Sequence, residues 1–210
     1  MRRPLMALMA AATATVAVAG IGVSAAPALA SRSVPADTVI NLTFPVTGST
    51  TIKKINSTIS LGPGTLASAA DLTTSTLTAT LTLPPATGSF KELGFITVTA
   101  TTKLIQVGQA TGTFNFNANT VTTTATARLQ LTSLNIAGIN IPVGSSCETS
   151  PTSITVASQP GFTFGLGGNL AGTYTIPHFA HCGLATLLIN LTLPGSGNTI
   201  TLTLGKSTVG

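Results

Sequence analysis

Residues 76–83 read TLTATLTL, in which threonine alternates with an apolar residue at every step. A period of two places the apolar side chains on one face of an extended strand and the threonines on the other face. Threonine suits a solvated face, because its branched side chain favours strands and its hydroxyl can bond across to a neighbouring strand. The stretch therefore predicts a β-strand with one buried and one exposed face.

The same alternation recurs along most of the chain after Ser31. It is present at residues 38–44, 95–102, 113–117, 121–132, 172–176, 187–193 and 199–204. Clusters of Pro, Gly and Asn separate these stretches and are typical of turns. Many short strands at such spacing predict an all-β fold, either an antiparallel β-sandwich of immunoglobulin-like type or a flattened barrel. Residues 67–72 (ASAADL) are the place where we expect a short helical turn.

Two stretches of the chain resemble each other. INLTFPVTG (40–48) and INLTLPGSG (189–197) agree at six of nine positions. An internal duplication would explain the agreement, and so would the shared composition of threonine-rich strands that end in Pro and Gly. We favour composition and predict a single domain, since no long polar linker divides the chain.

The N-terminal segment has the features of a secretory signal peptide. Arg2 and Arg3 precede a run of apolar and small residues, which ends in APALA at Ala30. A small residue, any residue and a second small residue form the usual cleavage site. We therefore predict a signal peptide at residues 1–30 and a secreted β domain at residues 31–210. We expect no membrane-spanning segment after cleavage.

The charge balance excludes some classes of partner. The chain has nine basic and four acidic residues, a formal charge of +5, and removal of Arg2 and Arg3 leaves seven against four, or +3. Only 6% of the residues are charged, and they are spread thinly. Nucleic-acid binding needs clustered cations and interleaved aromatic side chains, so we do not expect it. The 43% hydrophobic content argues against disorder.

The two cysteines predict a disulfide. Cys147 and Cys182 form an even pair in a secreted chain, and an intramolecular bridge is the usual outcome. If they lie opposite each other on antiparallel strands, Glu148 and His181 lie opposite each other too, and we expect a pH-sensitive pair there. His178, His181 and Cys182 are also crowded together, but the disulfide consumes the thiol, so we predict no metal site.

The chain has few of the side chains that enzymes use for catalysis. The chain has no G-x-S-x-G motif, and its carboxylates are Asp37, Asp71, Glu92 and Glu148. Sugar-cleaving sites need a carboxylate pair and aromatic platforms, whereas this chain has no Trp and one Tyr, Tyr174. We therefore expect no catalytic residues and no cofactor.

The small-residue N-terminal segment, the threonine-alternating strands and the stretch SSCETSPTSITV (145–156) together resemble small secreted β-rich proteins of actinobacteria. The resemblance is one of style and composition over most of the chain. It implies secretion and a β-rich fold, and it implies no activity or site residue.

Three functions remain open. The first is a non-enzymatic structural or interaction module at the cell envelope that docks an extracellular partner. The second is a carrier of a lipid or another hydrophobic small molecule, with Phe114, Phe116, Phe162 and Phe164 lining its site. The third, a pore-forming barrel, ranks last because the sequence cannot supply a girdle of aromatic residues.

Overall fold

The computed structural model describes residues 39–92 and 94–210, which belong to one compact unit, Ala36–Gly210. The predicted signal peptide at residues 1–30 and the start of the predicted β domain lie outside the described residues. Every strand pairing in the described part of the chain is antiparallel. The prediction of an antiparallel all-β fold is therefore confirmed.

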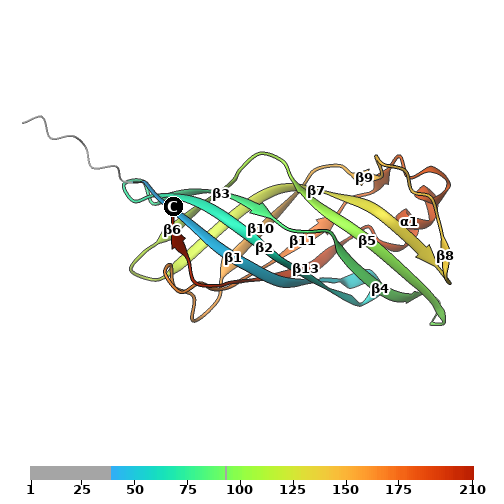
Figure 1. Cartoon of the computed structure of the whole chain (residues 1–210), viewed down its shortest axis with the longest axis horizontal. Coiled ribbons are helices and arrows are strands. Elements are labelled where there is room, and N and C mark those ends of the chain that lie inside the picture. Colours follow the sequence, from blue (N-terminus) through green and yellow to red (C-terminus); the bar gives the residue numbers. More distant parts are fainter. Residues whose placement is uncertain (1–38, 93) are drawn as a thin grey trace, which may run out of the picture. The chain divides into compact units, whose positions relative to one another are not determined.

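Eight strands form a ring in which each is hydrogen-bonded to the next (Figure 1). In spatial order they are β10 (Thr152–Ser158), β11 (Gly168–Ile176), β13 (Gly195–Leu204), β1 (Val39–Ile52), β2 (Ser57–Asp71), β3 (Thr76–Thr82), β6 (Ala110–Asn115) and β7 (Thr120–Ile136). The pairing of β7 with β10, from Ala127 opposite Thr152 to Thr122 opposite Ala157, closes the ring. Closure gives partners to backbone groups that an open sheet would leave bare at its edges.

β7 is long enough to pair with different strands along its two halves. Its first half pairs with β6 and β10, and its second half pairs with β5 (Ile96–Gln106) as far as Val98 opposite Ile136. β4 (Ala86–Glu92) pairs with β5, and the Ser57 hydroxyl at the start of β2 donates a hydrogen bond of 3.1 Å to the Ser89 carbonyl of β4. β4 and β5 therefore continue the wall between β7 and β2.

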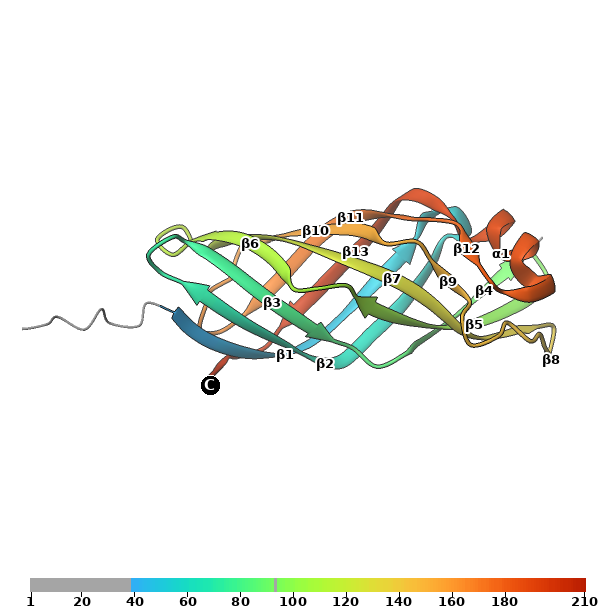
Figure 2. The same cartoon turned by 90° about the horizontal axis from the view of Figure 1, so that it is seen from above.

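The remaining elements are short. β8 (Ile139–Asn140) pairs with the end of β7, β9 (Glu148–Thr149) pairs with β12 (Phe179–Ala180) and β7, and β14 (Thr208–Val209) pairs with β1. The helical segments are η1 (Lys53–Ile55), η2 (Gly183–Ala185) and α1 (Thr186–Thr192). In both views, α1 and β8 lie at the opposite end of the ring from the C-terminus (Figure 1, Figure 2). We call these two ends the α1 end and the C-terminal end.

The core fills the inside of the ring, and the alternation in the sequence decides which side chains enter it. In β13, Ile200, Leu202 and Leu204 are buried, while Thr199 before them and Thr203 between Leu202 and Leu204 are exposed. Leu131 of β7 is completely buried. The period of two in the sequence is therefore the pattern of inward and outward side chains in the wall.

One predicted strand is wrong. Residues 187–193 alternate as a strand would, but Thr186–Thr192 form α1. Ile189 and Leu193, four residues apart, are both buried, and the amide of Asn190 is bonded to the backbone of Phe179. A spacing of four fits a helix that buries one stripe, and a short apolar run supports either period.

The structure also bears on the helical turn expected at residues 67–72 and on the two similar stretches of sequence. Residues 67–72 form no helical turn: Ala67–Asp71 lie in β2, with β1 on one side and β3 on the other. The two similar stretches also adopt different structures, since residues 40–48 lie within β1, whereas 189–197 span the end of α1 and the start of β13. The difference agrees with shared composition as the source of the resemblance.

Candidate functional site

The space enclosed by the ring and by its continuation through β4 and β5, which we call the lumen, is lined almost entirely by apolar side chains. Towards the C-terminal end it contains a cavity of about 90 Å³, to which the eight ring strands and β5 contribute wall residues. Among the described residues of that wall, only Ser68, Thr123 and Gln106 are polar. The Gln106 amide is fully used, since it accepts from Leu81 N–H at 2.8 Å and donates to Ala79 O at 2.9 Å. This cavity is therefore a hydrophobic space.

A second cavity of about 60 Å³ lies further along the lumen. Leu104, Ile154 and Ile200 line both it and the first cavity. Its polar wall residues include Thr50 and Tyr174, whose hydroxyls are 2.8 Å apart. Single aliphatic side chains thus separate two neighbouring apolar spaces.

The third cavity is the largest of the three, at about 290 Å³, and lies beneath α1. Its walls come from β4, β5, β7 and α1, and Leu193 lines both this cavity and the second one. Among the described residues around it, Glu92 is the charged one and Thr192 is polar. The lumen therefore holds three apolar cavities in sequence along its length.

The four predicted lining phenylalanines form one aromatic cluster at the C-terminal end. Phe162 and Phe164 line the first cavity, whereas Phe114 is buried and lies outside that lining. Phe116 is exposed and stacks on Phe164, with ring centroids 4.9 Å apart. Phe114 and Phe116 therefore contact the lining residue Phe164 without lining the cavity themselves. Phe116 follows the last residue of β6 and lies in a turn.

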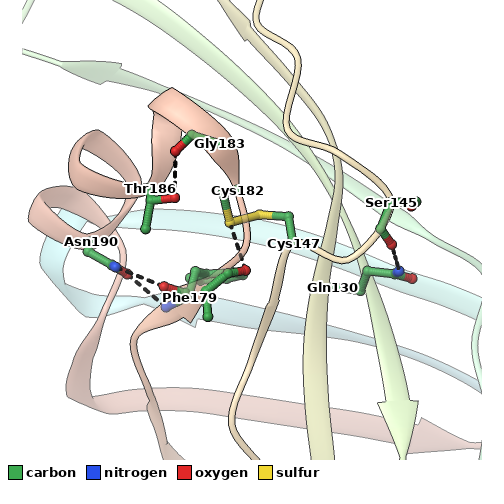
Figure 3. Close-up of a disulfide and its surroundings, with 9 residues drawn as sticks. Gln130, Ser145, Cys147, Phe179, Cys182, Gly183, Thr186 and Asn190 are labelled. Carbon is green, nitrogen blue, oxygen red and sulfur yellow. Dashed lines mark hydrogen bonds between the residues drawn. A yellow bond between two sulfur atoms is a disulfide. The ribbon is translucent and has the colours of Figure 1, made fainter.

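The predicted disulfide between Cys147 and Cys182 is present, with both residues fully buried (Figure 3). Cys182 directly precedes η2 and α1, so the bridge ties the base of this helical segment to the chain before β9. The Asn190 amide holds the helix from its other side: Phe179 N–H donates to its Oδ1 at 2.7 Å, and its Nδ2 donates to Phe179 O at 2.9 Å. α1 is therefore fixed over the third cavity.

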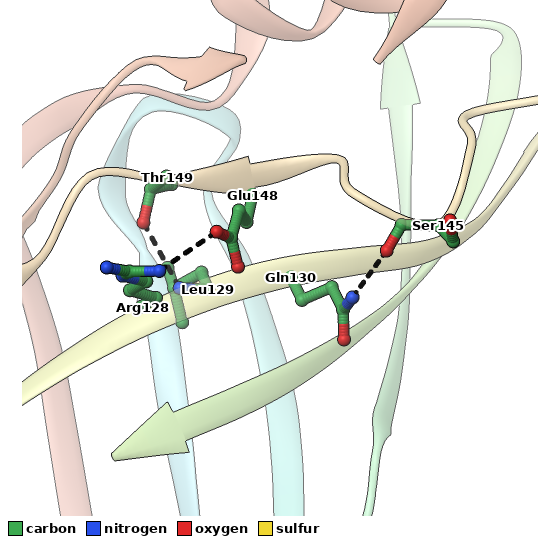
Figure 4. Close-up of polar contacts among 6 residues, drawn as sticks. All are labelled: Arg128, Leu129, Gln130, Ser145, Glu148 and Thr149. Atoms are coloured by element: carbon green, nitrogen blue, oxygen red, sulfur yellow. Dashed lines mark hydrogen bonds and ion pairs between the residues drawn. The ribbon is translucent and has the colours of Figure 1, made fainter. Parts of the chain in front are cut away.

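The register expected next to the disulfide is wrong by one residue. Ala180, and not His181, lies opposite Glu148. His181 has φ of 60°, a left-handed conformation that turns the chain out of β12, and its side chain is exposed. The Glu148 carboxylate instead accepts a hydrogen bond of 3.1 Å from Arg128 of β7 (Figure 4). The structure therefore brings Glu148 together with Arg128 and leaves the expected pair unformed.

A second polar interaction links β1 to β11 across β13, the strand between them. Thr50 of β1 donates to Thr199 O at 2.9 Å and bonds to the Tyr174 hydroxyl of β11. Burial raises the pKa of the Tyr174 hydroxyl above its ordinary value of 10.0, because a phenolate would lose its hydration there, and the bond with Thr50 lowers it in part. Tyr174 is therefore neutral at physiological pH.

Asn198 of β13 is another buried polar residue that the sequence did not single out. Its Oδ1 accepts from Lys53 N–H at 3.0 Å, and its Nδ2 donates to Gly195 O at 2.8 Å and Tyr174 O at 3.3 Å. Asn190 occupies a position that threonine usually fills in such a run, whereas Asn198 has the parity of the buried Ile200, Leu202 and Leu204. An Asn at an inward position of β13 is the signal that could have drawn attention to Asn198.

Among residues 39–92 and 94–210, no group of three or more His, Cys, Asp or Glu side chains is placed to hold a metal ion. The same part of the chain contains no helix with the length and hydropathy to cross a membrane.

No family model, curated protein or solved structure matches this chain.

Proposed function

We propose that this protein is a secreted, non-enzymatic binding protein of the cell envelope that carries a hydrophobic small molecule, such as a lipid chain, in its lumen. In this proposal the ring is a flattened barrel, because its inward side chains surround a common space. The observation that carries it is the series of three apolar cavities, separated only by aliphatic side chains such as Leu104 and Leu193.

The size of the third cavity supports this choice. A cavity of about 150 Å³ lined by aliphatic and aromatic side chains stays dry and takes up a small aromatic guest. The cavity beneath α1 has about 290 Å³, close to the lower limit of ordinary ligand pockets at about 300 Å³. Rotation of Leu193 would join it to the second cavity, and an extended apolar chain could then follow the lumen.

The chemistry of the walls supports an apolar ligand over a polar one. The hydroxyls of Thr50 and Tyr174 satisfy each other, and the amide of Gln106 is bonded to backbone groups. A polar molecule entering the first two cavities would exchange its bonds to water for contacts with hydrocarbon, at a cost of several kcal/mol for each unpaired group. An apolar chain meets no such cost.

The first test is native mass spectrometry with solvent extraction of the protein released into the medium by its own host. The expected result is a stoichiometric hydrophobic adduct. A saturation experiment with cis-parinaric acid, a fluorescent fatty acid, then measures binding by the delipidated protein. A bare mass together with the absence of saturable cis-parinaric acid binding would overturn the proposal.

A matched pair of variants locates the site. Ala100 of β5 is buried and lines the third cavity, so Ala100→Met fills part of that space. Ala67 of β2 is exposed on the outside of the ring, so Ala67→Met adds the same atoms elsewhere. We expect Ala100→Met to weaken cis-parinaric acid binding about tenfold, and Ala67→Met to bind as the wild type does. Equal binding by all three proteins would contradict a site in the third cavity.

A further inference from the structure

Exposed large apolar side chains gather at the α1 end of the ring. They come from three separate segments: the β4–β5 turn, the β7–β8 hairpin, and η2 with α1. We call this surface the apolar tip, and its residues are Phe95, Ile139, Leu184, Leu187 and Leu191. Leu184 is completely exposed and Leu187 is 72% exposed. A soluble domain seldom leaves so many large apolar side chains in water at one place without a partner for them.

The three segments meet around the third cavity. Glu92 and Ile96, which flank Phe95 in the chain, line that cavity, and so do Ile136, the strand partner of Ile139, and Leu188 of α1. The N–H of Ala137 donates a hydrogen bond of 2.9 Å to Thr97 O, which joins the β7–β8 hairpin to the start of β5. The three segments that carry the apolar tip therefore lie together at the α1 end (Figure 2).

Lysines lie beside the apolar tip. Lys53 and Lys54 belong to η1, and the Lys53 backbone is bonded to Asn198, near the start of β13, the strand that follows α1. Lys91 is in β4, one residue before Glu92 of the cavity wall. All three lysines are exposed, and the salt bridge between described residues, Arg128–Glu148, involves none of them. With Glu92 as the nearby acid, this end of the molecule carries a net positive charge.

We propose that the apolar tip docks on the surface of a lipid bilayer that contains anionic lipids. Leucine and phenylalanine side chains enter the boundary between headgroups and acyl chains, and lysines around them contact the headgroup phosphates, as in other interfacial anchors. The lysines favour this occupant over an uncharged apolar surface, because each cation near an anionic membrane adds to the attraction. The inference depends on exposed side chains alone, so it holds whether or not the lumen carries a ligand.

The test is co-sedimentation of the full chain, as its host releases it, with vesicles of phosphatidylcholine alone or with added phosphatidylglycerol. The tip variant is Leu187→Ser with Leu191→Ser. The matched control is Leu72→Ser with Leu166→Ser, since these leucines are exposed at the C-terminal end and Leu166 is 70% exposed. All proteins share one N-terminal sequence, so a difference between them reports on the surface that was changed.

We expect the tip variant to bind vesicles with phosphatidylglycerol at least a hundredfold more weakly than the wild type, because each of the two buried leucines contributes more than a factor of about ten. The control variant keeps wild-type binding. Equal binding by the two variants would overturn the proposal, as would absence of wild-type binding.

A second pair of variants tests the charges. Replacing Lys53, Lys54 and Lys91 with Gln removes the cations near the tip, whereas Lys103→Gln with Lys206→Gln removes cations from the β5 wall and the C-terminal end. We expect about fivefold weaker binding for each lysine removed near the tip. If the triple variant bound the vesicles as the wild type does, the proposal that the partner contains anionic lipids would be wrong.

Gel filtration distinguishes a membrane from the other possible partner of the apolar tip, a second copy of this chain. If the wild type is a dimer, the tip variant is a monomer and neither binds vesicles, the tip is an interface between two copies and the membrane proposal is wrong. A monomeric wild type that binds the vesicles supports it.

Discussion

Asn198 offers a quantitative test of how the α1 end is held together. Its side chain is 1% exposed and makes three hydrogen bonds, which join η1 to β13 and β13 to β11. Asn198→Ala removes these bonds and leaves the Lys53 N–H and two carbonyls without their protein partner. Each lost bond costs about 1 kcal/mol, and buried groups left unpaired cost more, so we expect a loss of about 3 to 4 kcal/mol in the free energy of unfolding.

The measurement is urea unfolding followed by far-ultraviolet circular dichroism. The control is Asn169→Ala, because Asn169 is exposed in β11 and its side-chain oxygen accepts one bond of 2.8 Å from the Thr203 hydroxyl. We expect the control to lose less than about 1 kcal/mol. If Asn198→Ala were no more destabilising than the control, the buried amide would not hold these elements together.

A charge at the same position sharpens the test. Asn198→Asp keeps an acceptor for Lys53 N–H but can no longer donate to the carbonyls of Tyr174 and Gly195 when ionised. We expect it to be at least as unstable as Asn198→Ala at neutral pH, and to recover part of the loss in acid, where the protonated carboxyl donates again. Stability that did not change with acid would contradict this account of the site.

Three further predictions follow from the fold. The disulfide closes a loop with a sequence separation of 35, so Cys147→Ser with Cys182→Ser should reduce the free energy of unfolding by about 4 kcal/mol, measured in urea. Tyr174 is the single tyrosine of the chain and Trp is absent, so the phenolate absorbance should titrate at higher pH in the native protein than in the urea-unfolded one. Because its folded-state pKa is raised, the stability that Tyr174 contributes is fully present below pH 10.0 and is lost as the pH rises through the folded-state value. Gly172→Ala should cost about 2 kcal/mol in thermal unfolding, because a β-carbon there would overlap the Thr155 carbonyl oxygen of β10, whereas Gly165→Ala, with open space around it, should change stability by less than about 0.5 kcal/mol.

Local patterns in the sequence predicted most of the wall. The alternation in TITLTL (199–204) gives the inward and outward faces of β13 correctly, since the period of two is a property of one extended strand. The pairing of the cysteines was also predictable, because the described pair has no competing cysteine in the chain. Neither inference needs to know which strands are neighbours.

The errors arise where a residue's role depends on distant partners. Residues 187–193 have an alternation that suits a strand, but the buried positions of Ile189 and Leu193 and the bonds of Asn190 to Phe179 favour a helix. The register next to the disulfide differs by one residue from the predicted one, because His181 turns the chain by a left-handed backbone conformation. Phe116 is predicted to line a ligand site, yet β6 ends at Asn115 and leaves it exposed.

The sequence by itself determined that the described chain is antiparallel and all-β, with threonine outside, leucine and isoleucine inside, and one disulfide. The inward and outward faces come from strand periodicity, which is a property of a few neighbouring residues. The disulfide comes from the cysteine count, because two cysteines allow only one pairing. Only the tertiary structure decided that eight strands close into a ring, that three apolar cavities lie in sequence along its lumen, and that exposed leucines gather beside lysines at one end. These features depend on the order of strands and the folding of short segments such as α1, which are set by contacts between residues far apart in the chain.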